Sequence, residues 1–472
     1  MIDFTDLGDA KRPLAFFEEL SRIPHGSGNT ALIADHLVRF AAERGLEHYR
    51  DETNNVIIKK PATVGYEHRP TVIFQGHLDM VAEKKLGAEI DMEREGLTLY
   101  RDGDLLRAQD TTLGGDDGVA LAYALAVLDA DDIPHPAFEV VFTSDEETGL
   151  IGATALDPSL VKGRLLINID SDVEGVFTVG CAGGVRSDLA LGLKREDARE
   201  LSVINLSLCE FKGGHSGVEI DKGRINAIKA LAEVLGAIDT RIATVSGGNA
   251  DNAIPRDVTC KLAYTDRDKL LSELEKMRTR YAELEPDIIY SLVEEREICA
   301  PLAKESSDTL ISLLSQLPSG VIAMSEDIDG LVETSLNLGI LRCLEDVAEV
   351  SFSVRSAKGA KKRELCERLA SIAKKHGASY GERGEYPAWE YRAESHLRDV
   401  CVRIYEDMYG KSPEVLIIHA GLECGILSEK IEGLDCISIG PDNYDIHTVE
   451  ERLSLPSFAR VWDYLKRVLK EV

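Results

Sequence analysis

Three apolar runs that each end in acidic residues place the strongest constraint on how this chain folds. They are TVIFQGHLDMV (71–81), FEVVFTSDEE (138–147) and GRLLINIDSD (163–172). Apolar runs of this length are typical of strands that are buried on both faces of a parallel sheet. In open parallel sheets, ligand sites form beyond the carboxyl ends of the strands. We therefore expect a buried sheet whose strand ends carry a polar site.

Helical segments alternate with these runs, which favours an α/β fold with a mixed, largely parallel sheet. A chain of 472 residues is too long for one ordinary hydrophobic core. Glycines in VGCAGGVRSD (179–188) break the pattern, and half-buried strands follow them. The segment GERGEYPAW (381–389) indicates a linker. We predict one domain built from residues 1–183 and 389–472, with residues 184–388 inserted as an α+β domain.

The composition indicates a soluble cytoplasmic protein with a small partner. Asp and Glu number 83 against 54 Lys and Arg, and the net charge of -29 would repel nucleic acid and anionic membranes. We find no apolar run near the roughly 18 residues of a membrane span. The nine cysteines contain no C-x-x-C pair, as expected for reduced thiols. The first residues do not have the pattern of a secretory signal.

His77 and Asp79 stand two residues apart at the end of the first apolar run. On a strand, such residues face the same way, so that the carboxylate can receive the second N–H of the imidazole. This arrangement is typical of a metal-ligating histidine and the carboxylate that orients it. For the tripeptide alone, a core histidine satisfied by a buried carboxylate is the commoner alternative.

Further polar clusters suggest that this histidine belongs to a larger site. Each of them alone is compatible with a helix cap or an exposed turn. They are the turn GGDDG with Asp116 and Asp117, the strand end SDEE with Asp145, Glu146 and Glu147, Asp170 in NIDSD, and His447 in IHTVEERL. So many carboxylates at adjoining strand ends could not all stay ionised without cations between them. We therefore predict two divalent metal ions, and the His and carboxylate donors favour zinc, cobalt or manganese.

The order of these motifs resembles a known family. GHLDMV, TTLGGDDGVA, SDEETGLIGA, NIDSD and IHTVEERL resemble the co-catalytic zinc metallopeptidases that include aminoacylase, carnosinase and glutamate carboxypeptidase. EELSRIPHGSGN, KGGHSG and HAGLECG are similar to the aminoacyl-histidine dipeptidase (Xaa-His dipeptidase) branch. The resemblance covers nearly the whole chain and implies a di-zinc peptidase catalytic domain with an inserted lid domain.

The resemblance also implies residue roles. Asp116 would bridge two zinc ions, Asp79 would orient a ligand, and Glu146 would be the general base. The remaining ligands would be His77 and Asp170 at one ion, and Glu147 and His447 at the other. Asp117 stands where this branch more usually has asparagine, and the resemblance assigns it no role.

Four residues are expected to contact the substrate by the same resemblance. His215 would stabilise the tetrahedral oxyanion, and Arg355 would grip the terminal carboxylate of the substrate. The alternatives are a turn histidine and an exposed strand arginine. Asn337 would be a further contact, and Glu423 would hold the free amino group. Ser353 departs from the aspartate that the wider family often has two residues before the arginine.

Three functions are compatible with this pattern. The first is a cytoplasmic metal-dependent dipeptidase that cleaves unsubstituted dipeptides, including Xaa-His peptides such as β-alanyl-histidine. The second is an N-acyl amino acid amidohydrolase, against which Glu423 argues because an acyl group needs no acidic partner. The third is a non-catalytic metal-binding or peptide-binding relative, against which Glu146 argues because binding alone needs no general base. A homodimer is expected, without a decisive sequence signal.

Overall fold

The three apolar runs with acidic ends form neighbouring parallel strands. The structure, a computed structural model, describes residues 2–326, 328 and 330–472. It places β3 (Val72–His77) between β6 (Phe138–Thr143) and β7 (Leu165–Asn168). All residues of the three strands are buried, because the sheet is covered on both faces. The predicted buried parallel strands are therefore confirmed.

These strands belong to a mixed sheet with the order β1, β2, β6, β3, β7, β21, β8, β20. The other strands of this sheet are β1 (Glu47–Arg50), β2 (Val56–Lys60), β8 (Val176–Cys181), β20 (Glu414–Ile418) and β21 (Asp435–Ser438). The pairs β6–β3, β3–β7, β7–β21 and β8–β20 are parallel, while β1–β2, β2–β6 and β21–β8 are antiparallel. The α/β fold with a mixed sheet is as predicted.

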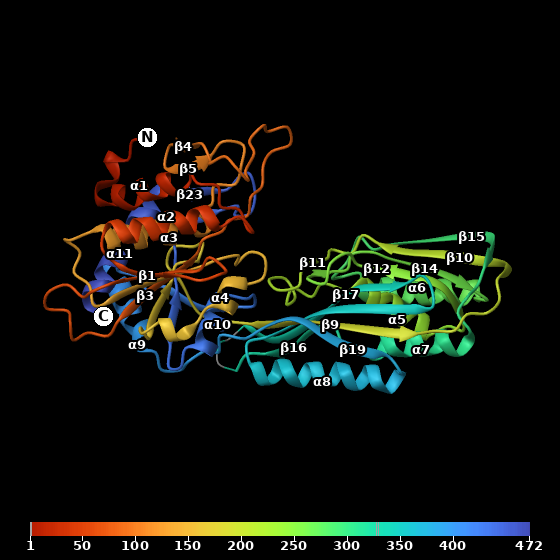
Figure 1. Cartoon of the computed structure of the whole chain (residues 1–472). Coiled ribbons are helices and arrows are strands. Elements are labelled where there is room, and N and C mark those ends of the chain that lie inside the picture. The colour runs from red at the N-terminus through yellow and green to blue at the C-terminus, as the bar shows by residue number, and fades with distance from the viewer. Residues whose placement is uncertain (1, 327, 329) are drawn as a thin grey trace. The chain divides into compact units, whose positions relative to one another are not determined.

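Helices from both ends of the chain pack around this sheet (Figure 1). They are α1 (Lys11–Leu20), α2 (Ala31–Glu43), α3 (Gly115–Asp129), α4 (Ile151–Ala155), α9 (His396–Tyr409), α10 (Glu423–Lys430) and α11 (Leu455–Glu471), with 3-10 turns at Thr5–Ala10 and Pro158–Leu160. Local signals set their ends. The Ser395 side chain caps α9 and Ser454 caps α11, while Gly410 ends α9 in the left-handed conformation that suits glycine.

A small antiparallel sheet with the order β22, β23, β5, β4 joins the N-terminal and C-terminal segments a second time. Its strands are β4 (Leu99–Asp102), β5 (Leu105–Ala108), β22 (Asn443–Tyr444) and β23 (Arg452–Ser454). The pairing of β23 with β5 brings the loop that carries His447 back to the first part of the chain.

The middle of the chain forms a second sheet, in which all neighbouring strands are antiparallel, with the order β15, β10, β14, β12, β17, β18, β9, β19. The strands are β9 (Gly183–Gly192), β10 (Arg199–Cys209), β12 (Arg241–Gly247), β14 (Val258–Ala263), β15 (Ile289–Cys299), β17 (Val332–Cys343), β18 (Val347–Ser356) and β19 (Ser379–Tyr386), with β16 (Gly320–Met324) beside β17. A hydrophobic core joins the sheet to its helices, which are α5 (Ala227–Gly236), α6 (Arg267–Tyr281), α7 (Lys304–Gln316) and α8 (Gly359–His376).

The predicted linker at residues 381–389 is wrong over most of its length. Strand β19 pairs with β9 along the sheet edge, with Glu382 opposite Ser187 and Arg383 opposite Arg186. Its glycines and charged residues made the sequence resemble a linker. Such residues are also what an exposed edge strand needs in order to avoid pairing with other molecules. The Arg383 guanidinium contacts the Asp188 carboxylate at 2.7 Å, on the neighbouring strand.

Two compact units result. Unit 1 contains Met1–Cys181, Tyr391–Ile418 and Leu422–Val472, and unit 2 contains Ala182–Glu390 and His419–Gly421. The chain therefore leaves unit 1 and later returns to it, so that both termini lie in unit 1 (Figure 1). The short segment that belongs to unit 2 within the last part of the chain was not expected. Among the described residues, every helix is too short or too polar to span a bilayer.

Candidate metal centre

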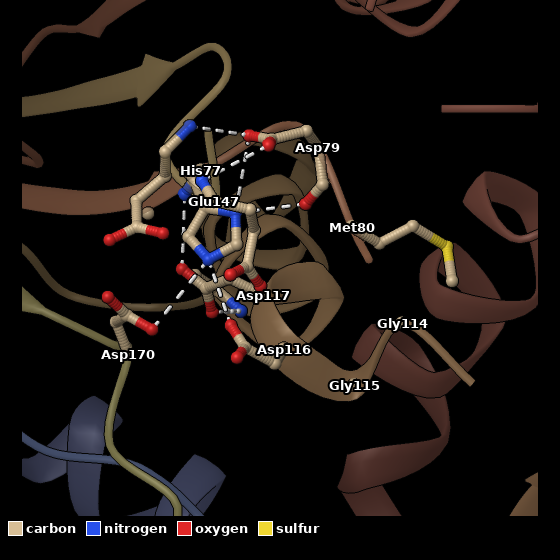
Figure 2. A network of polar contacts seen from close by, with 12 residues as sticks. His77, Asp79, Met80, Gly114, Gly115, Asp116, Asp117, Glu147 and Asp170 are labelled. Atoms are coloured by element: carbon tan, nitrogen blue, oxygen red, sulfur yellow. Dashed lines mark hydrogen bonds and ion pairs between the residues drawn. The ribbon is translucent and has the colours of Figure 1, made fainter. Parts of the chain in front are cut away.

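The carboxyl ends of three parallel strands bring the predicted ligands together. His77 is the last residue of β3, Glu146 and Glu147 follow β6, and Asp170 follows β7. Asp116 lies in the first turn of α3, which packs against β3. Figure 2 shows the side chains that come from these different elements gathered around the His77 ring.

Asp116 occupies the central position. Its Oδ1 lies 2.8 Å from His77 Nε2, and its Oδ2 lies 3.1 Å from His447 Nε2. Asp170 Oδ1 is 3.7 Å from the same nitrogen of His77. Glu147 Oε1 is 2.8 Å from His447 Nε2. The two oxygens of one carboxylate thus face two different histidines, each of which has a further carboxylate beside it.

Three groups of side chains have ligand atoms that all lie within 4.8 Å of one another. They are His77, Asp116 and Asp170; Asp116, Glu147 and His447; and His77, Glu146 and Glu147. The first two groups are the predicted ligand sets. The third includes Glu146, the predicted general base, so this carboxylate also lies close to the centre.

The centre holds strongly perturbed charges. The hydrogen bond with Asp116 and the nearby Glu147 carboxylate raise the pKa of His447 to about 10. Burial raises the pKa of Asp170 to about 6. Burial also raises the pKa of Glu146 well above its ordinary value. Without metal, some of these side chains therefore keep a proton near neutral pH. A divalent cation would compete with those protons for the same oxygen and nitrogen atoms.

Asp79 contacts His77 and also the turn that carries Glu146. His77 Nδ1 lies 2.9 Å from the main-chain oxygen of Asp79 and 3.5 Å from its carboxylate Oδ1. The carboxylate instead accepts hydrogen bonds from the main-chain N–H of Glu146 at 3.0 Å and from the Ser27 hydroxyl at 2.8 Å. In Figure 2, Asp79 and Asp170 lie on opposite sides of the His77 ring. The imidazole therefore lies near the expected carboxylate, and its hydrogen bond goes to the carbonyl of the same residue.

Asp117, which had no role from the sequence, holds the strand end. Its Oδ2 accepts a hydrogen bond from the His77 N–H at 3.1 Å, and the Asp117 side chain is buried. A side chain on Gly76 would overlap with Asp117, so the glycine permits this close approach. Asp117 thereby fixes the backbone of a predicted ligand.

Glu423 lies buried at the start of α10, in unit 1. Its Oε2 accepts hydrogen bonds from Thr143 Oγ1 at 2.5 Å and Gln75 Nε2 at 2.6 Å. Its Oε1 is buried and has no hydrogen-bond partner among the described residues. Burial raises the pKa of Glu423 to about 7. One carboxylate oxygen thus remains for another donor.

The other predicted substrate contacts belong to unit 2. His215 forms β11 (Gly214–His215), which pairs with β13 (Ala253–Ile254). The Asn337 amide donates to the main-chain oxygens of Asp251 and Ala253, both at 2.8 Å, and its buried Oδ1 has no hydrogen-bond partner within the described part of the chain. Arg355 donates from a terminal nitrogen to the Tyr386 hydroxyl at 3.1 Å, while its buried Nε has no hydrogen-bond partner among the described residues.

Comparison with known proteins decides the family. A sequence model of peptidase family M20/M25/M40 matches residues 73–471. The chain belongs to this peptidase family. The match includes the ends of β3, β6 and β7, the first turn of α3 and the loop that carries His447. Its members are peptidases, so the chain is a hydrolase.

Two relatives resemble this peptidase over nearly its full length. It is 36% identical over 467 residues to the cytosol non-specific dipeptidase of Escherichia coli strain K12, covering 97% of this chain and 96% of that protein. The crystal structure of an aminoacylhistidine dipeptidase from Vibrio alginolyticus has a TM-score of 0.93 and 33% identity, covering 100% of this chain and 98% of that one. An aminopeptidase of Bacillus cereus, at 18% identity and a TM-score of 0.58 over 98% of this chain and 99% of that one, shares the fold.

Sequence reasoning missed several residues of the peptidase that support the centre. Thr143 and Gln75 bind Glu423, although both sit inside runs that were interpreted only as buried strands. Glu451 was included in the motif of His447 but received no role. Its buried carboxylate contacts the turn before Asp116. The signal that could have revealed these residues is a polar side chain at a position that the pattern buries.

Proposed function

We propose that the chain is a two-metal dipeptidase that hydrolyses unsubstituted dipeptides, including Xaa-His peptides such as β-alanyl-histidine. One observation carries the proposal. The two oxygens of Asp116 face two different histidines, His77 and His447. A carboxylate in this position is suited to bridge two divalent ions. The names of the relatives, a non-specific dipeptidase and an aminoacylhistidine dipeptidase, support the substrate class.

The residues present fit a pair of metal ions. The proposed ligand sets are His77, Asp116 and Asp170 for one ion, and Asp116, Glu147 and His447 for the other. Their donors are carboxylate oxygens and imidazole nitrogens, which suit zinc, cobalt or manganese. Glu147 Oε1 lies 2.8 Å from His447 Nε2 without hydrogen-bond geometry, as two ligands of one ion do. When bound, the ions would polarise the scissile carbonyl and lower the pKa of the attacking water.

Glu146 is the proposed general base. Burial raises the pKa of its carboxyl, which suits a group that accepts a proton from water and returns it to the leaving amine. The Asp79 carboxylate holds the main-chain N–H of Glu146 and, at 3.4 Å, that of Glu147. Asp79 therefore fixes the turn that carries the base and one proposed ligand.

His215 is the proposed donor to the oxyanion of the tetrahedral intermediate. The Gly217 N–H donates to His215 Nδ1 at 3.2 Å, so a neutral ring carries its proton on Nε2. Burial and the nearby Arg355 guanidinium lower the pKa of His215, which keeps the ring neutral near pH 7. The Nε2–H is then the hydrogen-bond donor that this ring would offer to the oxyanion.

The remaining polar atoms suit the two ends of a dipeptide. We assign the terminal carboxylate of the substrate to Arg355, because a planar guanidinium binds a carboxylate in two places. We assign the free amino group to Glu423, whose Oε1 has no hydrogen-bond partner among the described residues. Asn337 would offer the substrate its Oδ1, because its amide N–H groups already bind main-chain oxygens. Unit 2 would serve as the lid inserted into the catalytic unit.

The direct test is release of histidine from β-alanyl-histidine by protein that has been stripped with a chelator and reloaded with zinc, cobalt or manganese. We expect release to return with metal. A panel of unblocked dipeptides and their N-acetylated forms should separate dipeptidase from acyl hydrolase activity, with Glu423→Gln reducing only the former. Hydrolysis of the acetylated forms alone, or of nothing in any metal form, would contradict the proposal.

Location and assembly are further proposals. We propose that the enzyme acts in the cytoplasm, which the cytosolic name of the Escherichia coli relative supports. We also propose a homodimer. Size-exclusion chromatography with light scattering would test it against a monomer mass of 51.7 kDa.

A further inference from the structure

A buried carboxylate from the far end of the chain holds the turn before Asp116. Glu451 Oε2 accepts the main-chain N–H groups of Leu113 at 2.7 Å and Gly114 at 3.0 Å. Glu451 Oε1 accepts the N–H of Gly115 at 2.8 Å, and the N–H of Asp116 lies 3.4 Å from the same oxygen. The Glu451 residue is only 3% exposed. One side chain thus satisfies consecutive donors of the turn.

The start of a helix presents unpaired N–H groups that favour an anion. The Glu451 carboxylate supplies this anion from a distant part of the chain. Its two oxygens act only as acceptors, and the Asn443 amide adds a donor to Oε1 at 3.3 Å. A Cβ on Gly115 would lie 2.7 Å from Asn443 Nδ2, so the turn has no spare room. An amide in place of the Glu451 carboxylate would aim an N–H group at other N–H groups.

Glu451 also closes the segment that carries His447. The Glu451 N–H donates to the Thr448 main-chain oxygen at 3.1 Å, and the Thr448 hydroxyl donates to the Asp445 main-chain oxygen at 2.7 Å. His447 itself has φ of 61°, a backbone conformation that depends on the surrounding turn. The Glu451 side chain therefore connects this turn with the one that carries Asp116.

The other proposed ligands have independent support. His77 is held by the β3 ladder, by the Asp117 carboxylate on its N–H and by the Asp79 main-chain oxygen on Nδ1. Asp170 follows β7, whose whole length is buried. Loss of the Glu451 contacts would therefore disturb the geometry between Asp116 and His447 first.

We propose that Glu451 is a positioning residue for the metal centre, which fixes Asp116 relative to His447. Through these residues it sets the affinity for the ion that they share with Glu147. This inference rests on the proposed two-metal function. It assigns to one side chain a large part of the affinity of the centre for one of its two ions.

The test compares Glu451→Gln and Glu451→Asp with Glu450→Gln, the same chemical change one residue away on an exposed side chain. Metal is removed from each protein with a chelator, and binding of zinc and of cobalt is then measured by calorimetry and by metal analysis after dialysis. We expect Glu451→Gln to weaken the affinity for the second equivalent of metal by about 10-fold to 100-fold, as loss of a group that supports a ligand does. The first equivalent should change only a few-fold, Glu451→Asp should fall between, and Glu450→Gln should bind like the unmodified protein.

The outcomes separate the two proposals. An unmodified protein that binds fewer than two equivalents contradicts the proposed function. If it binds two, and Glu451→Gln binds both with unchanged affinity, the role of Glu451 is wrong. Equal weakening of both equivalents also overturns it, because that result is expected of a general structural residue. The thermal midpoint of each metal-free variant is recorded, so that a folding defect is recognised by a fall that Glu450→Gln does not share.

Discussion

Glu146 and Glu147 are neighbours in the sequence, yet the structure gives them different surroundings. The Glu147 carboxylate lies against His447, and the pKa of the Glu146 carboxyl is raised by burial. A raised pKa suits proton transfer near neutral pH, whereas a metal ligand must stay ionised. The surroundings of the two carboxylates therefore divide the two proposed roles between adjacent residues.

Replacement of the base should separate chemistry from metal binding. In Glu146→Gln, we expect kcat for β-alanyl-histidine to fall by about 10²-fold to 10⁴-fold, because the variant has no group that accepts the proton. The two metal equivalents should remain, as measured by metal analysis of the dialysed protein. Loss of metal together with activity would instead identify Glu146 as a ligand, which its closeness to His77 allows.

His419 should make the stability of unit 2 depend on pH. Burial lowers the pKa of His419 to about 4, and its Nε2 lies 2.7 Å from the Ser335 hydroxyl. Because the unfolded pKa is about 6.5, the unfolded chain binds a proton between pH 6.5 and 4 while the folded chain does not. The contribution of His419 is therefore complete above pH 6.5 and is lost as the pH falls toward 4. A shift of this size corresponds to about 3 kcal/mol.

The measurement is urea unfolding of His419→Gln and of its parent at pH 7 and pH 4.5. The chain has two tryptophans, Trp389 in unit 2 and Trp462 in unit 1. A Trp462→Phe background lets Trp389 fluorescence report on unit 2. We expect acid to lower the midpoint of the parent more than that of the variant. Equal losses would show that His419 titrates normally in the folded state.

At the scale of elements, β3 and α3 approach closely enough to set the distance between His77 and Asp116. Gly76 makes this possible, because a Cβ there would overlap with Ala120 and with the Asp117 carboxylate. The helix can therefore lie directly against the strand that ends in His77. A side chain at this position would force the two elements apart.

Gly76→Ala should therefore damage both stability and metal binding. We expect a loss of about 1–3 kcal/mol in the free energy of unfolding, as overpacking of a core does, together with weaker binding of both ions. Gly192→Ala on β9 is the control, because its Cβ would meet nothing within 4 Å. Chemical unfolding and metal titration measure the two effects. A Gly76→Ala protein that matches the control in both would contradict the close approach.

Local patterns were sufficient to predict the elements that position the centre. The runs that became β3, β6 and β7 are predominantly apolar, and their acidic ends identified the strand ends that carry His77 and Asp170. The sequence pattern gave the wrong prediction at β19, because an edge strand with charged residues and glycines has the same composition as a linker. Edge strands are stabilised by their ladder to a distant neighbour, and a single sequence does not reveal that ladder.

Contacts between distant segments explain what the sequence did not predict in the site. Glu451 reaches a turn more than 330 residues earlier in the chain, and nothing in IHTVEERL distinguishes its side chain from the exposed Glu450. Asp79 was expected to receive an imidazole N–H on its carboxylate, whereas its carboxylate binds the turn after β6. Residue types and spacing select the candidate ligands, but their supporting contacts depend on the folded topology.

At the scale of the whole molecule, the proposed metal centre belongs entirely to unit 1. All five proposed ligands lie there, and unit 2 has its own hydrophobic core. Ions that bind only the folded state stabilise the unit that holds them. Removal of metal should consequently affect the two units to different extents.

Calorimetry of the chelated and the zinc-loaded protein tests this difference. With free zinc at 100 times its dissociation constant, the unit that binds it gains about 2.7 kcal/mol. We expect the transition of unit 1 to move to lower temperature on chelation and that of unit 2 to stay. The Trp389 fluorescence of the Trp462→Phe protein identifies the unit 2 transition. A shift of both transitions by the same amount would mean that the units unfold together.

The order of strands in unit 1 has a consequence for synthesis on the ribosome. Strand β21 lies between β7 and β8, although it is made more than 250 residues after both begin. While the chain emerges, the strand that lies between β7 and β8 is therefore missing. Unit 2 is complete before that strand, β21, has been made. His447 and Glu451 appear still later. Until β21 has been made, the nascent chain holds the two parts of this sheet without the strand that joins them, so this is the period in which a chaperone would be most useful to it.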